Sequence, residues 1–356
     1  MLGNIYEAKP KYELWEKLLF DKITDIRLNE NVNVIVDLKQ VYRKIFRSSF
    51  VLDSIENSYL EVVTEEIVAD IIGIISHYRN FFAKTCGKYT KFYFVYSEKE
   101  CEYFKNIFPE YKEDYYFKYF KDPENMDKIK LSKRITKALK FVLNLIPNAE
   151  YIDSSDFDEL VYMKYIVESS KQNEFNLILS NDELIYSLLN YHTYALDMKG
   201  VDTHCITNKN VYDILSAPAQ FSHSLYIILM SITGIKKYSI PGIYGHKYLK
   251  TVKLIEELLK NNYLENSRYL VFPLIKEQLD SNIKILKPLI ENFDTVKFNF
   301  DLFNFDKVLN ENRIAIYNKF VKNNPIVSVK TFEELNQRVF RNFPLNINHL
   351  LKGELL

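Results

Sequence analysis

The sequence contains few glycines, prolines and cysteines, and it has no excess of charge of either sign. Its 356 residues include 8 Gly, 10 Pro and 3 Cys, and 47 basic residues balance 47 acidic ones. Because the cysteines are odd in number and no pair has metal-ligand spacing, we expect no disulfide framework and a reducing, cytoplasmic location. The six histidines stand singly, so no zinc site is indicated. A net charge of zero gives no bulk signal for nucleic acid, and any basic surface has to be local.

Long hydrophobic runs are also absent. The longest, around residues 225–230, is far shorter than the roughly 20 apolar residues that span a bilayer. The N-terminal segment MLGNIYEAKPKYELW carries early charges and no apolar stretch, so we expect no signal peptide and no membrane partner. Aromatic residues, in contrast, are numerous. The 27 Tyr and 25 Phe fit either the codon bias of an A/T-rich genome or aromatic platforms for nucleobases.

Short apolar runs alternate with segments of helical periodicity. The predicted strands are residues 32–38, 91–97, 149–155 and 175–182, and the predicted helices are residues 64–85, 132–145 and 156–170. This alternation is typical of an α/β fold with a doubly wound parallel sheet, in which ligands bind beyond the carboxyl ends of the strands. A helix–turn–helix is predicted at about residues 218–262. The last hundred residues have mixed α and β character, with a strand pair expected at residues 293–305.

Acidic residues stand at or beside the ends of three of the four predicted strands. They are Asp37, then Asp153 with Asp156, and then Asp182. Carboxylates that converge on one sheet edge can bind Mg²⁺, and two such ions about 4 Å apart can stabilise both the attacking and the leaving oxygen of a phosphodiester displacement. Asp37, Asp156 and Asp182 also precede helical segments, so capping of helix N-termini explains them comfortably without a metal.

Two further segments could contact nucleic acid. In GIKKYSIPGIYGHKYLKT, residues 234–251, Gly242 and Gly245 flank a tight turn, and Lys247, Lys250 and Lys253 follow it. Such a turn can hold a phosphate on the backbone N–H groups of the next helix, but it is also a common structural corner. The Lys-, Tyr- and Phe-rich residues 103–120 fit either a single-strand-binding insertion or an amphipathic helix with an aromatic core face.

Taken in order, five segments resemble the flap-endonuclease and phage ribonuclease H family of 5′ nucleases over residues 30–260. VNVIVDLKQVYRKIF resembles the family's first strand and first metal-binding Asp, and GKYTKFYFVYSEKECEYFKNIFPEYKEDY resembles the second strand and the entry to the helical arch. DSSDFDELVYMKYIV resembles the family's E-A-D-D motif and its helix. NLILSNDELIYSLL resembles S-x-D-x-D, and SITGIKKYSIPGIYGHKYLKTVKLI resembles the helix–three-turn–helix that grips duplex DNA.

The resemblance implies a PIN-like, 5′-nuclease-like α/β fold: a parallel central sheet flanked by helices, a helix–three-turn–helix DNA-binding region and an α+β C-terminal extension. The corresponding domains are an N-terminal extension at residues 1–30, a nuclease domain at 31–215 with an arch-like segment at 103–130, the helix–three-turn–helix region at 216–264 and the extension at 265–356. The implied catalytic residues are Asp37, Asp156, Asp158, Glu159 and Asp182, of which Asp37, Asp158, Glu159 and Asp182 would bind metal. The implied DNA-binding residues are Lys105, Lys112, Gly242, Gly245, Lys247 and Lys250.

Several family carboxylates are replaced in this chain. Ser97 stands where the second strand should end in Asp, and in the second metal site Leu184, Ile235 and Tyr238 stand on three of four acids. Leu and Ile offer no oxygen ligand, and the lost charge no longer offsets desolvation of a divalent ion. We therefore expect at most one tightly bound Mg²⁺ or Mn²⁺, with Asp153, Glu98 or Glu183 as acids that could replace a missing ligand.

Three functions fit these departures. The chain could bind duplex DNA, branched flap DNA or an RNA–DNA hybrid as a weakened or inactive nuclease homologue. It could be an active Mg²⁺-dependent 5′–3′ exonuclease or flap endonuclease of DNA replication or repair that uses a residual metal site. It could also be a structural or scaffold protein of a phage particle or replisome that contacts other phage replication or virion proteins, since a fold does not determine a function. A phage-encoded protein would work in the cytoplasm of the infected bacterium or in the virion.

Overall fold

The computed structural model describes the parts of the chain that build the sheet and the helices around it. These are residues 31–39, 90–97, 101–112, 126–143, 148–171, 173–196, 205–207, 223–245, 247–264 and 271–321, with Ile146 and scattered positions between 64 and 80. The predicted N-terminal extension at residues 1–30 and most of the predicted arch, residues 113–125, lie outside this part. Among the described helices, none has the length and apolar character needed to cross a bilayer.

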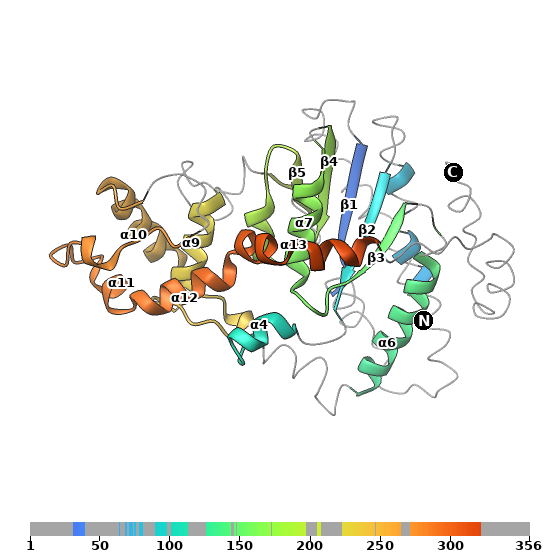
Figure 1. The fold of residues 1–356 in the computed structure, drawn as a ribbon, viewed down its shortest axis with the longest axis horizontal. Helices are drawn as coiled ribbons and strands as arrows, with labels where there is room; N and C mark the ends of the chain where they lie inside the picture. Colours follow the sequence, from blue (N-terminus) through green and yellow to red (C-terminus); the bar gives the residue numbers. More distant parts are fainter. Residues whose placement is uncertain are drawn as a thin grey trace, which may run out of the picture.

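A six-stranded sheet forms the centre of the larger part of the molecule (Figure 1). Its spatial order is β3-β2-β1-β4-β5-β6, and the pairs are parallel except for β5 with β6. This confirms the predicted doubly wound α/β architecture, and the four predicted strands agree with β1 to β4 within three residues at either end. The strands are β1 (Asn31–Asp37), β2 (Thr90–Tyr96), β3 (Ala149–Asp153), β4 (Glu174–Leu179), β5 (Thr193–Leu196) and β6 (Cys205–Ile206).

Each face of the sheet is covered by a separate apolar core. Along β1, Val34 and Val36 belong to one core and Ile35 to the other, because successive strand side chains point to opposite faces. The Val34 face packs against α6 (Met126–Leu143) and against the described helical positions between 64 and 80. The Ile35 face packs against α7 (Glu159–Ser169), whose residues from Glu159 to Met163 are all buried. A helix buried on all sides needs a layer outside it as well.

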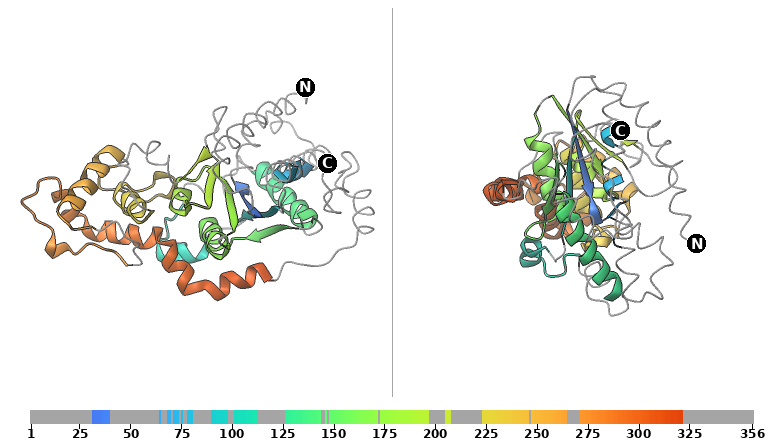
Figure 2. Two further views of the ribbon diagram at one scale, coloured as in Figure 1. Left: turned by 90° about the horizontal axis from the view of Figure 1, so that it is seen from above. Right: turned by 90° about the vertical axis from the view of Figure 1, so that its right-hand side faces the viewer.

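The C-terminal helix α13 (Phe305–Val321) supplies that outer layer (Figure 2). Lys164 of α7 pairs with Asp306 of α13 at 3.0 Å, and both residues are buried. At the other end of α13, Lys319 pairs with Asp156 at 2.7 Å. The helix therefore lies across α7 and fastens the last described segment of the chain onto the sheet domain.

A smaller helical part extends from the sheet domain (Figure 1). It contains α9 (His223–Thr233), the 3₁₀ turns η6 (Lys236–Tyr238) and η7 (Lys276–Gln278), α10 (Tyr248–Lys260), α11 (Lys287–Glu291) and α12 (Phe293–Phe303). The helix–turn–helix expected at residues 218–262 corresponds to α9, η6 and α10.

The strand pair expected at residues 293–305 is wrong, because α12 occupies that segment. Its apolar residues satisfy two periods at once. Read every second residue, Val296, Phe298, Phe300 and Leu302 resemble a strand. In the structure the segment is helical, and the residues at helical spacing are the buried ones: Phe293, Val296, Phe300 and Phe303. Phe298, which does not fit this spacing, is 38% exposed. The described residues of the predicted C-terminal extension thus form helices.

Candidate functional site

The carboxyl ends of the parallel strands carry polar residues that are buried together. β1 ends at Asp37, which is only 3% exposed, and the residue after β4 is Ser180, which is 1% exposed. The Ser180 hydroxyl donates to Asp37 Oδ2 at 2.7 Å and accepts from the Asp182 backbone N–H at 3.1 Å. β1 and β4 are neighbouring parallel strands, so their carboxyl ends lie at the same edge of the sheet. Asp37 at the end of β1 therefore lies beside the turn that begins at Ser180 after β4.

Two further acids arrive at this edge as helix caps. Asp158 is the N-cap of α7, and its Oδ1 accepts from the Leu160 N–H at 3.1 Å. Asp182 caps η5 (Glu183–Leu188) in the same way through the Leu184 N–H at 3.0 Å. Both acids are buried, as is Glu159 in the first turn of α7. The capping role expected at Asp156 is therefore taken by Asp158, two residues later.

Three lysines are paired with these acids. The Lys112 ammonium donates to Asp158 Oδ2 and lies 3.7 Å from Glu159 Oε2. Lys39 Nζ donates to Glu159 Oε1 at 3.2 Å, and Lys237 Nζ lies 2.8 Å from Asp182 Oδ2. Lys39 and Lys112 are themselves buried, at 7% and 2% exposed. Buried charges persist in proteins when they are paired and hydrogen-bonded, and each of these three acids has such a partner.

Two tyrosines also donate hydrogen bonds to these acids. The Tyr111 hydroxyl donates to Asp158 Oδ2 at 2.9 Å, and the Tyr238 hydroxyl donates to Asp182 Oδ2 at 2.5 Å. The Lys112 ammonium lies 4.2 Å from the centre of the Tyr238 ring, within the range of a cation–π interaction. Lys112 adopts a left-handed backbone conformation with φ of 54°, and its N–H donates to the Tyr238 carbonyl at 3.1 Å. The turn after α4 (Glu102–Ile107) is thus fixed to η6.

The pKa values of these groups follow from burial and from this pairing. Burial, with the nearby Glu159 charge second, raises the pKa of Asp37 to about 6. Burial also opposes ionisation of Asp182, but Lys237 and Lys112 outweigh it and hold the pKa of Asp182 well below its usual range. For Lys112 burial lowers the pKa, whereas Asp158 and Glu159 more than compensate and leave it well above the usual value. Burial lowers the pKa of Lys39 even with Glu159 beside it.

No family model matches the sequence, and no curated protein matches it. Solved structures do. A complex of the bacteriophage T5 flap endonuclease with DNA and metal ions has a TM-score of 0.57 at 16% identity and covers 90% of this chain and 99% of its own. The T5 protein co-crystallised with metal ions gives 0.57 at 15%, with 90% and 99% covered. The T5 5′-exonuclease with bound zinc gives 0.56 at 14%, with 87% and 98% covered.

The chain has the fold of a flap endonuclease. This confirms the fold that the sequence resemblance implied. The structure also contains the parallel sheet, with acids at the ends of its strands, on which that resemblance depended. At identities of 14–16% the likeness extends to the fold and not to the chemistry of the site, which has to be judged from the residues of this chain.

The acids of this flap-endonuclease fold do not fit a divalent metal centre. Among the described residues, no three Asp, Glu, His or Cys side chains are grouped so that they could bind an ion. Carboxylate oxygens of Asp158, Glu159 and Asp182 instead accept hydrogen bonds from Lys112, Lys39 and Tyr238, respectively. Carboxylate oxygens already bound to ammonium and hydroxyl groups are not free to replace the water shell of Mg²⁺.

The four positions at which the resemblance predicts lost acids carry no carboxylate. Ser97 is buried after β2, and Leu184 and Ile235 are buried in the apolar core. The Tyr238 hydroxyl donates a hydrogen bond to Asp182 instead of serving as a second ligand beside it. Asp156, expected to be catalytic, is exposed and pairs with Lys319 of α13, away from the buried acids.

The acids considered as substitutes have other partners or lie outside the described residues. Asp153 accepts from the Ser155 N–H at 3.1 Å and lies 3.6 Å from Lys140. Glu183 accepts from the Tyr248 hydroxyl at 3.0 Å. Glu98 falls in an undescribed segment.

The turn between α9 and α10 has the geometry that its glycines indicated. A Cβ on Gly242 would lie 1.8 Å from the Thr233 carbonyl oxygen, so this position requires glycine for close backbone approach. Gly245 needs glycine for a different reason, a φ of 57°. Lys247 and Lys250 are exposed at the start of α10, and Lys247 provides no side-chain cap. Lys105 donates to the Pro109 carbonyl at 2.6 Å.

Sequence reasoning missed the cations of the site. Lys112 was expected to contact DNA, but it is buried against Asp158 and Glu159 and cannot reach a phosphate in this arrangement. No motif pointed to Lys39 or Lys237. A signal was present, since Lys39 stands two residues after Asp37, and Lys237 directly precedes Tyr238 at a position expected to be acidic.

Proposed function

We propose that this protein binds duplex or branched DNA through a flap-endonuclease fold without hydrolysing it. The observation that carries the proposal is the pairing of lysine ammonium groups with the acids at the sheet edge. Lys112, Lys39 and Lys237 take up the oxygens of Asp158, Glu159 and Asp182. Phosphodiester hydrolysis in a two-metal site needs ions that contact both the attacking and the leaving oxygen, and an ammonium buried against a carboxylate does neither.

Charge counting supports this proposal. Four acids, Asp37, Asp158, Glu159 and Asp182, face three lysines, so the cluster carries one net negative charge with Asp37 ionised and none with it protonated. An edge whose acids are paired with lysines neither attracts a divalent ion as strongly as four unpaired acids would nor offers surplus positive charge to a phosphate. Removing one partner of a buried ion pair costs about 3–5 kcal/mol, so opening the site for metal is expensive.

DNA binding is proposed from the α9–turn–α10 segment. Gly242 brings two stretches of backbone together, and exposed Lys247, Lys250 and Lys253 lie along the first two turns of α10. Backbone N–H groups at a helix start and nearby lysines form the usual combination for a phosphate backbone. The T5 flap endonuclease, which has this fold, is seen in complex with DNA.

A nuclease assay tests the catalytic half of the proposal. The full-length protein is incubated with 5′-flap, nicked duplex and RNA–DNA substrates in Mg²⁺ or Mn²⁺, beside an Asp37→Ala variant. We expect no cleavage above the level of that variant. Cleavage by the wild type that Asp37→Ala abolishes would refute the proposal.

Salt-dependent binding tests the other half. The affinity for a labelled duplex is expected to fall steeply with salt, and Lys247→Ala with Lys250→Ala should reduce the log–log slope by about 0.9 for each phosphate that is no longer neutralised. Lys260→Ala is the matched control, since Lys260 is 76% exposed on the opposite end of the same helix. An unchanged slope, or no binding at low salt, contradicts DNA binding at this turn.

One observation favours a second candidate, a metal-dependent nuclease whose lysines move aside when substrate and metal enter. Glu159 and Asp182 still lie close enough to Asp37 for their charges to raise its pKa. This candidate predicts Mn²⁺ at the sheet edge in a soaked crystal and cleavage in the assay above. The first candidate predicts neither.

A further inference from the structure

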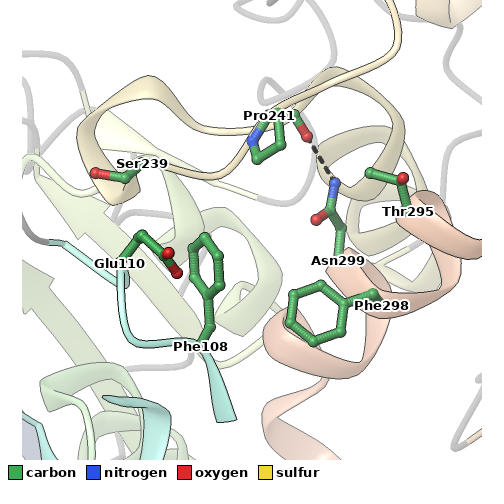
Figure 3. Close-up of a pocket in the computed structure, with 7 residues that line it drawn as sticks. All are labelled: Phe108, Glu110, Ser239, Pro241, Thr295, Phe298 and Asn299. Carbon is green, nitrogen blue, oxygen red and sulfur yellow. Dashed lines mark hydrogen bonds between the residues drawn. The ribbon is translucent and has the colours of Figure 1, made fainter. Parts of the chain in front are cut away.

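A cleft of about 480 Å³ opens where the two parts of the molecule meet (Figure 3). Three segments form its walls: the turn after α4, the turn between α9 and α10, and the exposed side of α12. Its volume falls in the range of small-ligand sites, roughly 300–1,000 Å³. The lining residues used below are Phe108, Glu110, Ser239, Pro241, Phe298 and Asn299.

Two phenylalanines give the cleft an aromatic wall. Phe108 and Phe298 pack edge to face, with ring centres 5.8 Å apart and an angle of 76° between the rings. Phe298 is 38% exposed, because the helical period of α12 leaves it outside the core. Part of its ring is therefore available to a flat ligand, and stacking of a base on such a ring is tolerant of sequence.

The cleft offers side-chain acceptors on Asn299 and Glu110, beside the hydroxyl groups of Ser239 and Thr295. Asn299 is 1% exposed, and its Nδ2 donates both to Ser231 O at 2.9 Å and to Pro241 O at 2.8 Å. These two bonds fix the amide, so that its oxygen turns toward the cleft (Figure 3). Glu110 extends from the opposite wall beside Phe108. Ser239 lines the cleft too, and its hydroxyl oxygen is buried without a hydrogen-bond partner in the described structure.

We propose that this cleft binds an unpaired, amino-bearing nucleobase of a single-stranded DNA tail. The proposal rests on the DNA binding proposed above and adds a site for the unpaired strand. Acceptors on Glu110 and Asn299 suit the exocyclic amino group of cytosine or adenine, because carboxylates and amide oxygens accept from such groups. Thymine has no amino group and offers these acceptors only its N3–H, so we expect it to bind less tightly.

The surroundings favour a nucleotide over an apolar peptide. Exposed lysines adjoin two walls of the cleft: Lys236 stands three residues before Ser239, and Lys297 precedes Phe298. They supply positive charge for the phosphates of a strand whose base enters the cleft. The neighbouring turn carries Gly242 and leads to Lys247, the segment proposed to hold the duplex.

Fluorescence anisotropy on tailed duplexes tests the proposal. The probes share one labelled duplex that is blunt or carries a short tail of deoxycytidine, deoxyadenosine or thymidine, in 5′ and 3′ polarity. We expect a cytosine or adenine tail of one polarity to bind more tightly than the blunt duplex and the thymine tail. Phe298→Ala should weaken that tail by about fivefold or more and leave the blunt duplex unchanged. Phe298→Tyr should keep most of the gain, and Glu110→Gln should reduce the preference over thymine.

Ile314→Ala on α13 is the matched control, since Ile314 is 78% exposed and far along the chain from the cleft. Circular dichroism of each variant verifies folding. Equal affinity for all tails, or a tail effect that Phe298→Ala leaves intact, overturns the nucleobase site while blunt-duplex binding still supports the proposed function. Failure to bind any of the DNAs overturns both.

Discussion

Replacing Lys112 with methionine tests whether its ion pair with Asp158 stabilises the buried acids at the sheet edge. Lys112 and Asp158 are almost fully buried, at 3% and 0% side-chain exposure. Removing one partner of a buried pair leaves the other charge without compensation and costs about 3–5 kcal/mol. Asp158 keeps its bonds from the Tyr111 hydroxyl and the Leu160 N–H, and Glu159 keeps Lys39. We therefore expect a loss near the lower end, about 3 kcal/mol of unfolding free energy.

Urea denaturation of four proteins measures this value: the wild type, Lys112→Met, Asp158→Asn and the double variant. The asparagine preserves the helix cap. If the ion pair is the source of the loss, the double variant should recover at least about 1 kcal/mol relative to additivity, since interacting partners couple by 0.5–3 kcal/mol. Lys260→Met is the control, because Lys260 is 76% exposed and should change stability by less than about 0.5 kcal/mol.

A loss at Lys112→Met below about 1 kcal/mol, or strict additivity in the double variant, would refute the argument. The edge acids would then be stabilised by something other than Lys112, and the reason for excluding metal would weaken. The variant is not expected to gain nuclease activity, because Lys39 and Lys237 still pair with Glu159 and Asp182.

Three further outcomes are expected. Asp37→Asn should stabilise the protein at pH 8 by about 3 kcal/mol, because the pKa of Asp37 is raised from 3.8 to about 6 and its ionised form therefore opposes folding. The gain in unfolding free energy should shrink as the pH falls through 6 and vanish near 4. A difference in urea denaturation that does not change with pH would contradict this. The melting temperature should be the same in EDTA and in Mg²⁺, whereas an ion at 100 times its dissociation constant would add about 2.7 kcal/mol and a clear upward shift. Gly242→Ala should lower the unfolding free energy by about 3 kcal/mol or more, since the added Cβ would collide with the Thr233 carbonyl. Gly245→Ala should lower it by only about 1–2 kcal/mol, because of the positive φ at that position. Equal losses in the two variants would show that the close backbone approach at Gly242 is unimportant.

The strands and the acid edge could be predicted because their signals are local. β1 is a β-branched run that ends in an acid, and its neighbours β2 and β4 are short, mostly buried apolar runs. Once parallel strands are predicted, their carboxyl ends must share an edge, so Asp37 and Asp182 could be expected to lie near each other. The choice of cap was harder, and the structure selects Asp158 rather than Asp156 because only the former begins α7.

The cations could not be predicted because their pairing is long-range. Lys112 and Asp158 are 46 residues apart, and Lys39 and Glu159 are 120 apart. No spacing rule joins such residues, and an isolated lysine in a polar stretch is usually a solvated one. The α12 segment failed for a different reason. Its apolar residues fit periods of both 2 and 3.6, and only packing against α9 and the adjoining turns selects the helix.

The buried acids of the sheet edge and the lysines beside them are best understood together. A cluster of buried acids is unfavourable without countercharge, and in a metalloenzyme the ions provide it. At this edge Lys39, Lys112 and Lys237 provide positive charge to the buried acids from within the chain. Asp37 fits this argument as the group left with the least compensation, since among the described acids with a shifted pKa it alone has a raised one. The ion pairs thereby supply countercharge to the buried acids from within the chain, which is what the proposed DNA binding without hydrolysis requires.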